Sequence, residues 1–288
     1  MTWQALCRSG AEALVAAGIG DAATEARLLL LGVFDMELSV YAERSTAEVS
    51  PDDAARYDAA VRERAGRRPL QYILRKADFY GRTFYVDERV LIPRFDTEVL
   101  IEAVLERARP GMRILEIGTG SGAPLCTVLL ERPGIRAFGT DADPGALAVT
   151  QRNLSSFGLS AELLERDLFD GVPGVYDIIY SNPPYIPDGE IEKLMPEVAD
   201  CEPRRALSGG SDGLALYPRI AKGAARHLAE GGWLLLEIGK GQEDAVSAYL
   251  AEEGFRELIR IRDLADIVRV VGGRYAGTQP SVHGEENV

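Results

Sequence analysis

The residues best suited to chemistry lie in the segment SNPPYIPD, residues 181–188, which follows the apolar run YDIIY. Two adjacent prolines remove two backbone donors and fix two φ angles, so the segment cannot continue a central strand. The side-chain carbonyl of Asn182 and the backbone carbonyl of Pro183 are acceptors, and two acceptors that converge hold an NH2 group. Tyr185 offers a flat face that covers a planar amide or base. The segment predicts a grip on a planar, weakly basic nitrogen, although a strand exit stiffened by proline also fits the pattern.

A second segment, LEIGTGSGAPL, follows the apolar run RILEI and leads into a helical pattern. Gly118, Gly120 and Gly122 are typical of a tight turn after a strand, where a missing Cβ lets the backbone approach a ligand closely. Asp141 ends the next apolar run, and a carboxylate at that position accepts hydrogen bonds from both hydroxyls of a ribose. The glycine spacing alone also fits a dinucleotide site or a turn without a ligand. Together with Asp141 it predicts a nucleotide-sized pocket.

The elements that must position these residues alternate between short apolar runs and helical segments from residue 112 onward. The apolar runs are RILEIG, IRAFGTD, AELLERD, YDIIYSN and WLLLEIG, followed later by FRELIRIRD and IVRVVGGR. Such alternation predicts βαβ units and a mostly parallel sheet of seven strands covered by helices on both faces, a Rossmann-like α/β fold. Because the carboxyl ends of parallel strands share one edge, the glycine turn, Asp141 and the NPPY segment are expected on the same rim.

The N-terminal residues form amphipathic helical patterns. In DAATEARLLLLGVF, Asp21 is the expected N-cap. The expected apolar face of that helix consists of Leu28, Leu29, Leu31 and Val33. A later helix is expected to begin after the cap residue Ser50 and to end at Gly66.

These patterns divide the chain into four parts. Residues 1–75 are expected to form a helical substrate-docking domain, and residues 76–92 a hairpin linker in which ADFYGRTFYVD turns at Gly81. Residues 93–274 hold the α/β domain, which opens on a helix capped by Asp96 or Thr97. Residues 275–288 read as a disordered tail.

Composition limits the classes of partner. A net charge of −13 disfavours a long phosphate backbone as the main partner, although the segment from Arg62 to Arg82 is rich in arginine. We interpret that segment as a solvated helix face and linker. Three cysteines without a CxxC pattern and two histidines suggest neither a disulfide framework nor a metal site. The chain has no run of 18 apolar residues, so we expect no membrane segment. We also expect a cytoplasmic location, a monomeric state and no stable nucleic-acid partner.

The motifs together carry a resemblance. NPPY after a strand, downstream of E-x-G-x-G-x-G, resembles the S-adenosylmethionine-dependent methyltransferases that act on amino groups. The segments PLQYILRKADFYG, VLIPRFDTEVLIE, RDLFDG, SNPPYIP, EPRRALSGGSDGLALY and LLLEIGKGQ are similar, in order, to the family that methylates the glutamine of the Gly-Gly-Gln motif in peptide chain release factors. The similarity is closest over residues 69–243.

The resemblance implies a role for individual residues. It implies that S-adenosylmethionine is bound by Gly118, Thr119, Gly120, Ser121, Gly122, Asp141, Asp167, Leu168 and Asn182. It implies that the glutamine amide is held by Asn182, Pro183, Pro184 and Tyr185. Among these, Asn182, Pro183 and Tyr185 are the expected catalytic residues, with Tyr185 also near the sulfonium as a cation–π partner. Neither a metal nor a general base is required, because the cofactor carries an activated methyl group.

Several positions depart from the family pattern. Phe95 stands where proline is frequent, Leu168 where some members have tryptophan, and Arg75 where glycine is usual. The segment DLADIVRVV lacks the usual Gly-Arg-Asp. These departures bear on cofactor affinity and local packing more than on the expected catalytic contacts.

Two alternative functions stay open at this level. One is methylation of an exocyclic amino group of a nucleic-acid base, which the arginine-rich segment favours and the acidic total disfavours. The other is a non-catalytic protein that binds S-adenosylmethionine and acts as a scaffold in translation termination. Glu237 and Gln242 in LLLEIGKGQ fit a buried helix cap as well as a site, and they are not included among the site residues.

Overall fold

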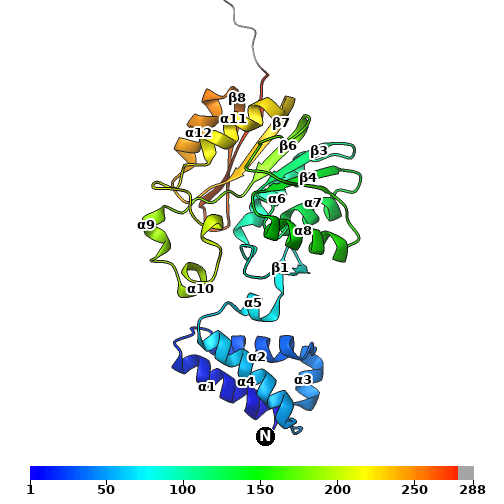
Figure 1. The fold of residues 1–288 in the computed structure, drawn as a ribbon, viewed down its shortest axis with the longest axis vertical. Helices are drawn as coiled ribbons and strands as arrows, with labels where there is room; N and C mark the ends of the chain where they lie inside the picture. The colour runs from blue at the N-terminus through cyan, green and yellow to red at the C-terminus, as the bar shows by residue number, and fades with distance from the viewer. Residues whose placement is uncertain (278–288) are drawn as a thin grey trace, which may run out of the picture.

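The computed structural model describes residues 1–277, with a helical N-terminal domain below an α/β domain (Figure 1). The helices of the first domain are α1 (Trp3–Ala16), α2 (Ala22–Val33), α3 (Leu38–Arg44), α4 (Pro51–Ala65) and α5 (Leu70–Leu74). As predicted, the Ser50 hydroxyl caps α4 by accepting from the Asp53 backbone N–H, and α4 ends at Gly66. Asp21 occupies the N-cap of α2 without a side-chain cap bond.

The buried face of α2 differs from the predicted one. Its buried residues are Ala22, Ala26, Leu29 and Leu30. Leu28 is 42% exposed. The buried positions repeat every three to four residues, and this stripe faces α1 and α4. In a run of four leucines the period alone leaves the direction of the face open, so packing against neighbouring helices decided it.

A two-stranded hairpin links the domains, as predicted. Strands β1 (Ala77–Phe79) and β2 (Arg82–Phe84) pair antiparallel. Tyr80 and Gly81 between them have φ values of 50° and 70°, the left-handed pair that a two-residue hairpin turn requires. Phe79 and Phe84 are buried in the core of the α/β domain, and this anchors the linker to that domain.

The α/β domain has the predicted seven-stranded sheet, in the order β5-β4-β3-β6-β7-β9-β8. Its strands are β3 (Arg113–Ile117), β4 (Arg136–Asp141), β5 (Glu162–Glu165), β6 (Tyr176–Ser181), β7 (Leu228–Glu237), β8 (Phe255–Arg262) and β9 (Val268–Tyr275). All neighbours pair in parallel except β9, which is antiparallel to β7 and β8. The strand order reverses between β3 and β6, which is where such sheets bind ligands.

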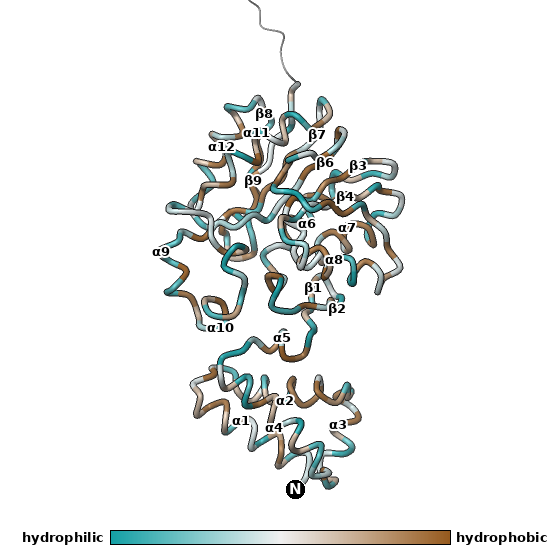
Figure 2. Tube along the Cα trace, in the orientation of Figure 1, coloured by the Kyte–Doolittle hydropathy of each residue, from teal (hydrophilic) through white to brown (hydrophobic). Residues whose placement is uncertain are grey.

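Helices cover both faces of this sheet (Figure 1). One face is covered by α6 (Asp96–Arg107), α7 (Ala123–Glu131) and α8 (Pro144–Ser156), and the other by α11 (Tyr217–His227) and α12 (Glu243–Glu252). Successive strand residues alternate between the two cores: Ile114 belongs to the first and Leu115 to the second. Figure 2 shows the resulting hydrophobic stretches, in brown, running along the strands.

A long segment between β6 and α11 carries short helices only: α9 (Asp188–Ile191), α10 (Pro196–Ala199) and the 3-10 turn η1 (Arg204–Ala206). It begins directly after the NPPY residues and descends toward the N-terminal domain (Figure 1). There Glu197 accepts from both Arg64 and Arg67, at 3.0 and 3.1 Å. Arg64 is buried and also pairs with Glu25 of α2. The chain that forms the NPPY corner is therefore tied to the N-terminal domain.

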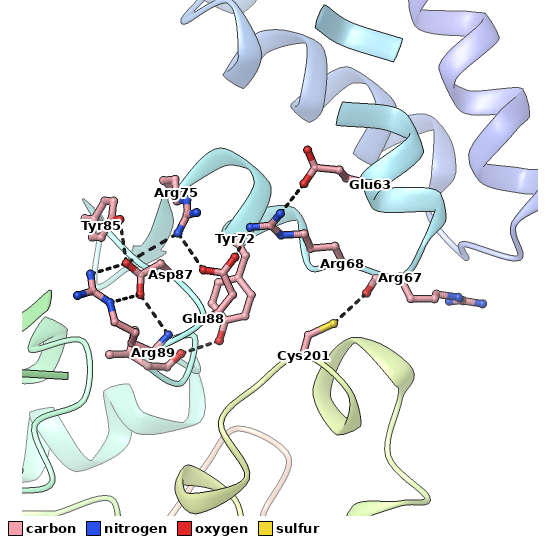
Figure 3. A network of polar contacts seen from close by, with 11 residues as sticks. Glu63, Arg67, Arg68, Tyr72, Arg75, Tyr85, Asp87, Glu88, Arg89 and Cys201 are labelled. Carbon is pink, nitrogen blue, oxygen red and sulfur yellow. Dashed lines mark hydrogen bonds and ion pairs between the residues drawn. The ribbon is translucent and has the colours of Figure 1, made fainter. Parts of the chain in front are cut away.

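The arginine-rich segment is partly the solvated face that the sequence suggested, with Arg62, Arg75 and Lys76 exposed, but several of its arginines form ion pairs. Arg68 reaches Glu63 and Glu88, and Arg75 reaches Glu88 (Figure 3). Arg82 pairs with Glu131 at 2.6 Å. Glu63 lies five residues from Arg68, whereas Glu88 and Glu131 lie 13 to 49 residues from the arginines they pair with, and composition by itself does not indicate such pairs.

Two boundary predictions are corrected. Helix α6 begins at Asp96 with Phe95 at the N-cap, so neither Asp96 nor Thr97 caps it. Thr97 is instead buried and bonds to Asn182. Tyr275, which was assigned to the tail, is the last residue of β9 and packs on Phe255. The tail proper, residues 278–288, lies outside the described residues.

Candidate active site

A cavity of about 270 Å³ opens at the carboxyl ends of β3, β4 and β6. Most of the residues singled out in the sequence border it: Gly118, Thr119, Gly120, Ser121, Asp141, Asp167, Leu168, Asn182, Pro183 and Pro184. Gly122 and Tyr185 are not among the lining residues. The two predicted walls, the glycine turn and the NPPY corner, thus face one space.

The glycines of the turn differ in what they do. Gly118, Gly120 and Gly122 all have positive φ, at 75°, 52° and 72°. A Cβ at Gly118 or Gly120 would meet nothing within 4 Å, so these two leave room for a ligand. A Cβ at Gly122 would lie 2.6 Å from Cγ2 of Thr150 on α8. Gly122 therefore serves the close packing of the turn against α8 rather than the cavity.

Asp141 is held in place by backbone donors. Its Oδ2 accepts from the Gly120 N–H at 2.9 Å, and its Oδ1 accepts from the Asp143 N–H at 2.9 Å. Burial raises the pKa of Asp141, while the Gly120 N–H and the Arg205 guanidinium act in the opposite direction. Each carboxylate oxygen keeps acceptor capacity beyond these bonds, which suits the ribose hydroxyls expected at this position.

Glu116 is a site residue that the sequence analysis did not include. It is 3% exposed, borders the cavity, and its Oε2 has no hydrogen-bond partner among the described residues. Burial, reinforced by the charge of Asp141, raises the pKa of Glu116 well above its usual value. A buried unpaired oxygen is costly unless a ligand supplies a donor. Its place in E-x-G-x-G, at the end of β3, was the signal that pointed to it.

Four arginines border the cavity, and carboxylates of the protein engage three of them, whereas Arg166 donates to the backbone carbonyl of Glu165. Arg89 pairs with Asp87, Arg94 with Glu202, and Arg205 with Asp143. Glu116 and Asp141 consequently supply the acidic character of this wall. These acceptors fit S-adenosylmethionine, which carries a sulfonium, an ammonium and a ribose. The carboxyl oxygen of Glu116 that has no partner can accept from a cationic group of the cofactor.

At the NPPY corner, the side chain of Asn182 is oriented by α6. Its Nδ2 donates to Oγ1 of Thr97 at 3.0 Å, which leaves Oδ1 as the acceptor for a ligand. Pro183 and Pro184 border the cavity beside it. Oδ1 of Asn182 is thus available to accept from an NH2 group, and the grip on such a group stays a prediction.

Tyr185 was expected to cover a planar amide or base with its flat face, but it does not border the cavity. Its side chain is partly buried, and its hydroxyl lies 3.4 Å from Oε1 of Glu237. Gln242 donates from Nε2 to the backbone carbonyl of Tyr185 at 3.1 Å and to that of Gly213 at 3.2 Å. Glu237 and Gln242 therefore support the corner from behind. The signal for them was the run LLLEIGKGQ itself, because its strand β7 is the sheet neighbour of β6.

The comparisons with known proteins decide the family. Residues 5–74 match the PrmC N-terminal domain and residues 94–200 the methyltransferase small domain. The release factor glutamine methyltransferase of Geobacter sulfurreducens is 40% identical over 258 residues, which cover 89% of this chain and 91% of the relative. This chain belongs to the release factor glutamine methyltransferase family.

Another member of the family, from Cereibacter sphaeroides, is 41% identical over 269 residues and is covered to 96% of its length, with 93% of this chain. Among solved structures, a methyltransferase from Pyrococcus furiosus matches with a TM-score of 0.53 at 18% identity, over 69% of this chain and 91% of that one. That likeness shows the Rossmann-like methyltransferase fold. The similarity to family members thus spans both domains.

Residues 1–277 contain no group of three or more His, Cys, Asp or Glu side chains placed to hold a metal ion. No helix within that range is long and apolar enough to cross a membrane.

Proposed function

We propose that this protein transfers the methyl group of S-adenosylmethionine to the side-chain amide nitrogen of the glutamine in the Gly-Gly-Gln motif of peptide chain release factors. The observation that carries the proposal is that Asn182 and Pro183 border the same cavity as Gly118 and Asp141, in a chain of this family. The proposal includes a cytoplasmic location, where release factors act, and a monomeric state.

Different lining residues contact different parts of the cofactor. Asp141 accepts from the ribose hydroxyls, and Leu168 flanks the adenine together with Asp167, which Arg219 holds at 2.7 Å. Glu116 and the backbone from Gly118 to Ser121 face the methionine part, whereas Gly122 holds the turn against α8. Once bound, the cofactor supplies an electrophilic methyl group.

The amide wall supplies orientation. An amide nitrogen is a poor nucleophile because its lone pair is shared with the carbonyl group. Oδ1 of Asn182 and the carbonyl of Pro183 accept the two N–H bonds and direct the nitrogen toward the methyl group, and positioning of this kind is worth about 7–11 kcal/mol. The same acceptors stabilise positive charge that develops on the nitrogen. Pro184 and Tyr185 complete the corner, and Tyr185 joins it to Glu237 of β7.

The test is to incubate the protein with a full-length release factor and isotopically labelled S-adenosylmethionine, and to locate the label by mass spectrometry. We expect one methyl group, on the glutamine of Gly-Gly-Gln, and none on a matched factor in which that glutamine is alanine. Label on another residue, or no label on a folded factor, overturns the proposal.

The same experiment separates the two alternatives. Ribosomal RNA and DNA enter as parallel substrates, and label on a base identifies a nucleic-acid methyltransferase. The pairing of Arg68, Arg75 and Arg82 with acidic residues weakens the support for that alternative, because paired arginines attract phosphates less strongly. Binding of the cofactor without label on any substrate identifies a scaffold.

The N-terminal domain is proposed as the docking site for the release factor. Its α4 is tied through Arg64 and Glu197 to the segment that begins at the NPPY corner, so a factor bound there lies next to the cavity. Removing residues 1–68 should raise KM for the full-length factor and leave a short Gly-Gly-Gln peptide unaffected. Unchanged methylation of the factor by a folded truncated chain contradicts the docking role.

A further inference from the structure

The helices α1 to α4 and the α/β domain have separate hydrophobic cores. Within the described residues, the core of α1 to α4 continues into Leu70, Ile73 and Leu74 of α5 but includes no residue of the α/β domain. Tyr72, also of α5, belongs instead to a cluster with the linker and α8. Helix α5 is therefore the covalent connection between two bodies. Bodies without a shared apolar interface change their relative position unless other contacts fix them.

A loop of the α/β domain supplies such contacts. We call residues 187–207 the connecting loop; it carries α9, α10 and η1, and α10 lies nearest the N-terminal helices (Figure 1). Glu197 of α10 accepts from Arg64 at 3.0 Å and from Arg67 at 3.1 Å. Sγ of Cys201 donates to the Arg67 carbonyl at 3.7 Å (Figure 3).

These contacts carry the polar connection between the two bodies. Within residues 1–277, each hydrogen bond or ion pair that joins residues 1–67 to residues 93–277 ends on Glu197 or Cys201. A thiol is a weak donor, so Glu197 is the stronger of the two. The position of α1 to α4 relative to the cavity consequently depends on Glu197.

The connecting loop is fixed to the α/β domain at its base. Ile186 and Ser208, which flank it, form a parallel bridge, and the Gly209 N–H donates to the Ile186 carbonyl at 2.9 Å. Glu202, whose side chain is 1% exposed, pairs with Arg94 at 2.7 Å. The loop therefore belongs to the α/β domain as a rigid part, and its far end holds the N-terminal helices.

The far end meets a defined position on those helices. The side chain of Arg64 is 6% exposed, and Glu25 of α2 pairs with it as well as Glu197. The side chain of Glu197 is 14% exposed. Salt screens a pair at this depth less than it screens surface charges. A buried guanidinium held by carboxylates from both bodies fixes where they meet.

We propose that the connecting loop holds the docking surface for the release factor at a fixed separation from the cavity, and that Glu197 is the residue through which the enzyme favours a full-length factor over a short Gly-Gly-Gln peptide. The inference rests on the proposed function, because it assumes that the factor docks on the N-terminal domain and places its glutamine in the cavity.

The physical reason is effective concentration. A factor that contacts both bodies makes its second contact intramolecularly, and this contact is strongest when the separation of the two sites matches the factor. Domains that are already held in place also lose less freedom when the factor binds. A short peptide reaches the cavity alone, so the position of the N-terminal helices does not affect its binding.

The variant Glu197→Ala tests the proposal. It removes the contact of the loop with both arginines, while Arg64 keeps its pair with Glu25, so no buried charge is left unpaired. With full-length factor we expect KM to rise about 10-fold and kcat to stay nearly unchanged. With a short Gly-Gly-Gln peptide, KM and kcat should equal those of the wild type, and so should the affinity for S-adenosylmethionine.

A second variant tests whether the effect runs through the ion pair. Arg67→Ala should raise KM for the factor less than Glu197→Ala does, because Arg64 still holds Glu197. The double variant should resemble Glu197→Ala alone, since residues that act through one contact are not additive. If the two effects simply add, Glu197 does not act through Arg67.

The matched control is Glu192→Ala. It removes the same charge from the connecting loop at an exposed position, where the side chain forms no hydrogen bond or ion pair within residues 1–277. This variant should keep the wild-type KM for the factor, and thermal unfolding verifies that all variants are folded.

Small-angle X-ray scattering gives a readout that needs no substrate. The wild type and Glu192→Ala should fit a single arrangement of the two bodies, whereas Glu197→Ala should fit only a mixture of arrangements. An unchanged scattering profile for Glu197→Ala overturns the inference. So does an equal rise in KM for factor and peptide, because that would place the effect in the cavity. If the wild type methylates the factor and Glu197→Ala does so with the same KM, this inference fails alone, whereas a wild type that methylates no factor contradicts the proposed function.

Discussion

The two walls of the cavity are built in different ways. On the cofactor wall, Gly120 bonds to Asp141, 21 residues away, and Thr150 bonds to the Gly120 carbonyl from 30 residues away. On the amide wall, Asn182 bonds to Thr97 from 85 residues away, and Tyr185 meets Glu237 and Gln242 at separations of 52 and 57. The first wall is one βαβ unit, whereas the second is assembled from remote segments.

This difference shows where each function is vulnerable. The cofactor wall is held by backbone groups of adjacent elements, so its geometry follows from forming β3, β4 and α8. The amide wall depends on side chains from α6 and from the segment that follows β7. Substitutions outside the NPPY residues are therefore expected to alter its geometry. Changes on the first wall should appear in cofactor affinity, and changes on the second in turnover.

The sharpest test of the comparison exchanges one residue on each wall. Asn182→Ala should lower kcat about 10²- to 10³-fold, the usual loss for one preorganised polar contact to developing charge, with a much smaller loss of cofactor affinity. Asp141→Ala should weaken cofactor binding by about 1.5–3 kcal/mol, because it removes a charged acceptor. Calorimetric titration and single-turnover rates measure the two quantities. If both variants lose affinity and turnover equally, the walls are not separate.

A second test concerns stability on the cofactor wall. Gly122→Ala forces a side chain into left-handed backbone and against Thr150, and should destabilise the fold by about 2–4 kcal/mol. Gly118→Ala has the same backbone problem but open space, so its cost should be nearer about 1–2 kcal/mol. Urea unfolding of both variants measures the difference. Equal losses would show that packing against α8 contributes nothing.

The smallest expected effect lies behind the amide wall. Gln242→Ala removes the donor to the carbonyls of Tyr185 and Gly213, which should cost about 1–3 kcal/mol of stability and lower turnover while cofactor affinity stays constant. Gln151→Ala is the matched control, because that exposed residue of α8 bonds only to Ser155. Full turnover in a folded Gln242→Ala variant would contradict a supporting role.

Local patterns predicted the strands and helices and the position of the glycine turn and Asp141 at the cavity. The strand runs, the glycine turn and Asp141 were placed correctly because hydrophobic alternation and turn formation depend only on residues that are close in sequence. Thr97 was misassigned as a helix cap because the same residue type serves both purposes, and only the approach of Asn182 decides between them. Glu116 was passed over although its position before the glycines was visible.

The sequence by itself determined that the chain forms a seven-stranded α/β sheet with a glycine turn and an NPPY corner at the same edge, because periodicity and proline act locally. Only the tertiary structure decided that Thr97, Glu237 and Gln242 stand behind that corner, and that Glu88 and Glu131 pair with arginines of the arginine-rich segment. These contacts join residues far apart in the chain. Which residues meet in these contacts depends on how the sheet and the helices pack, and local sequence patterns do not encode that packing.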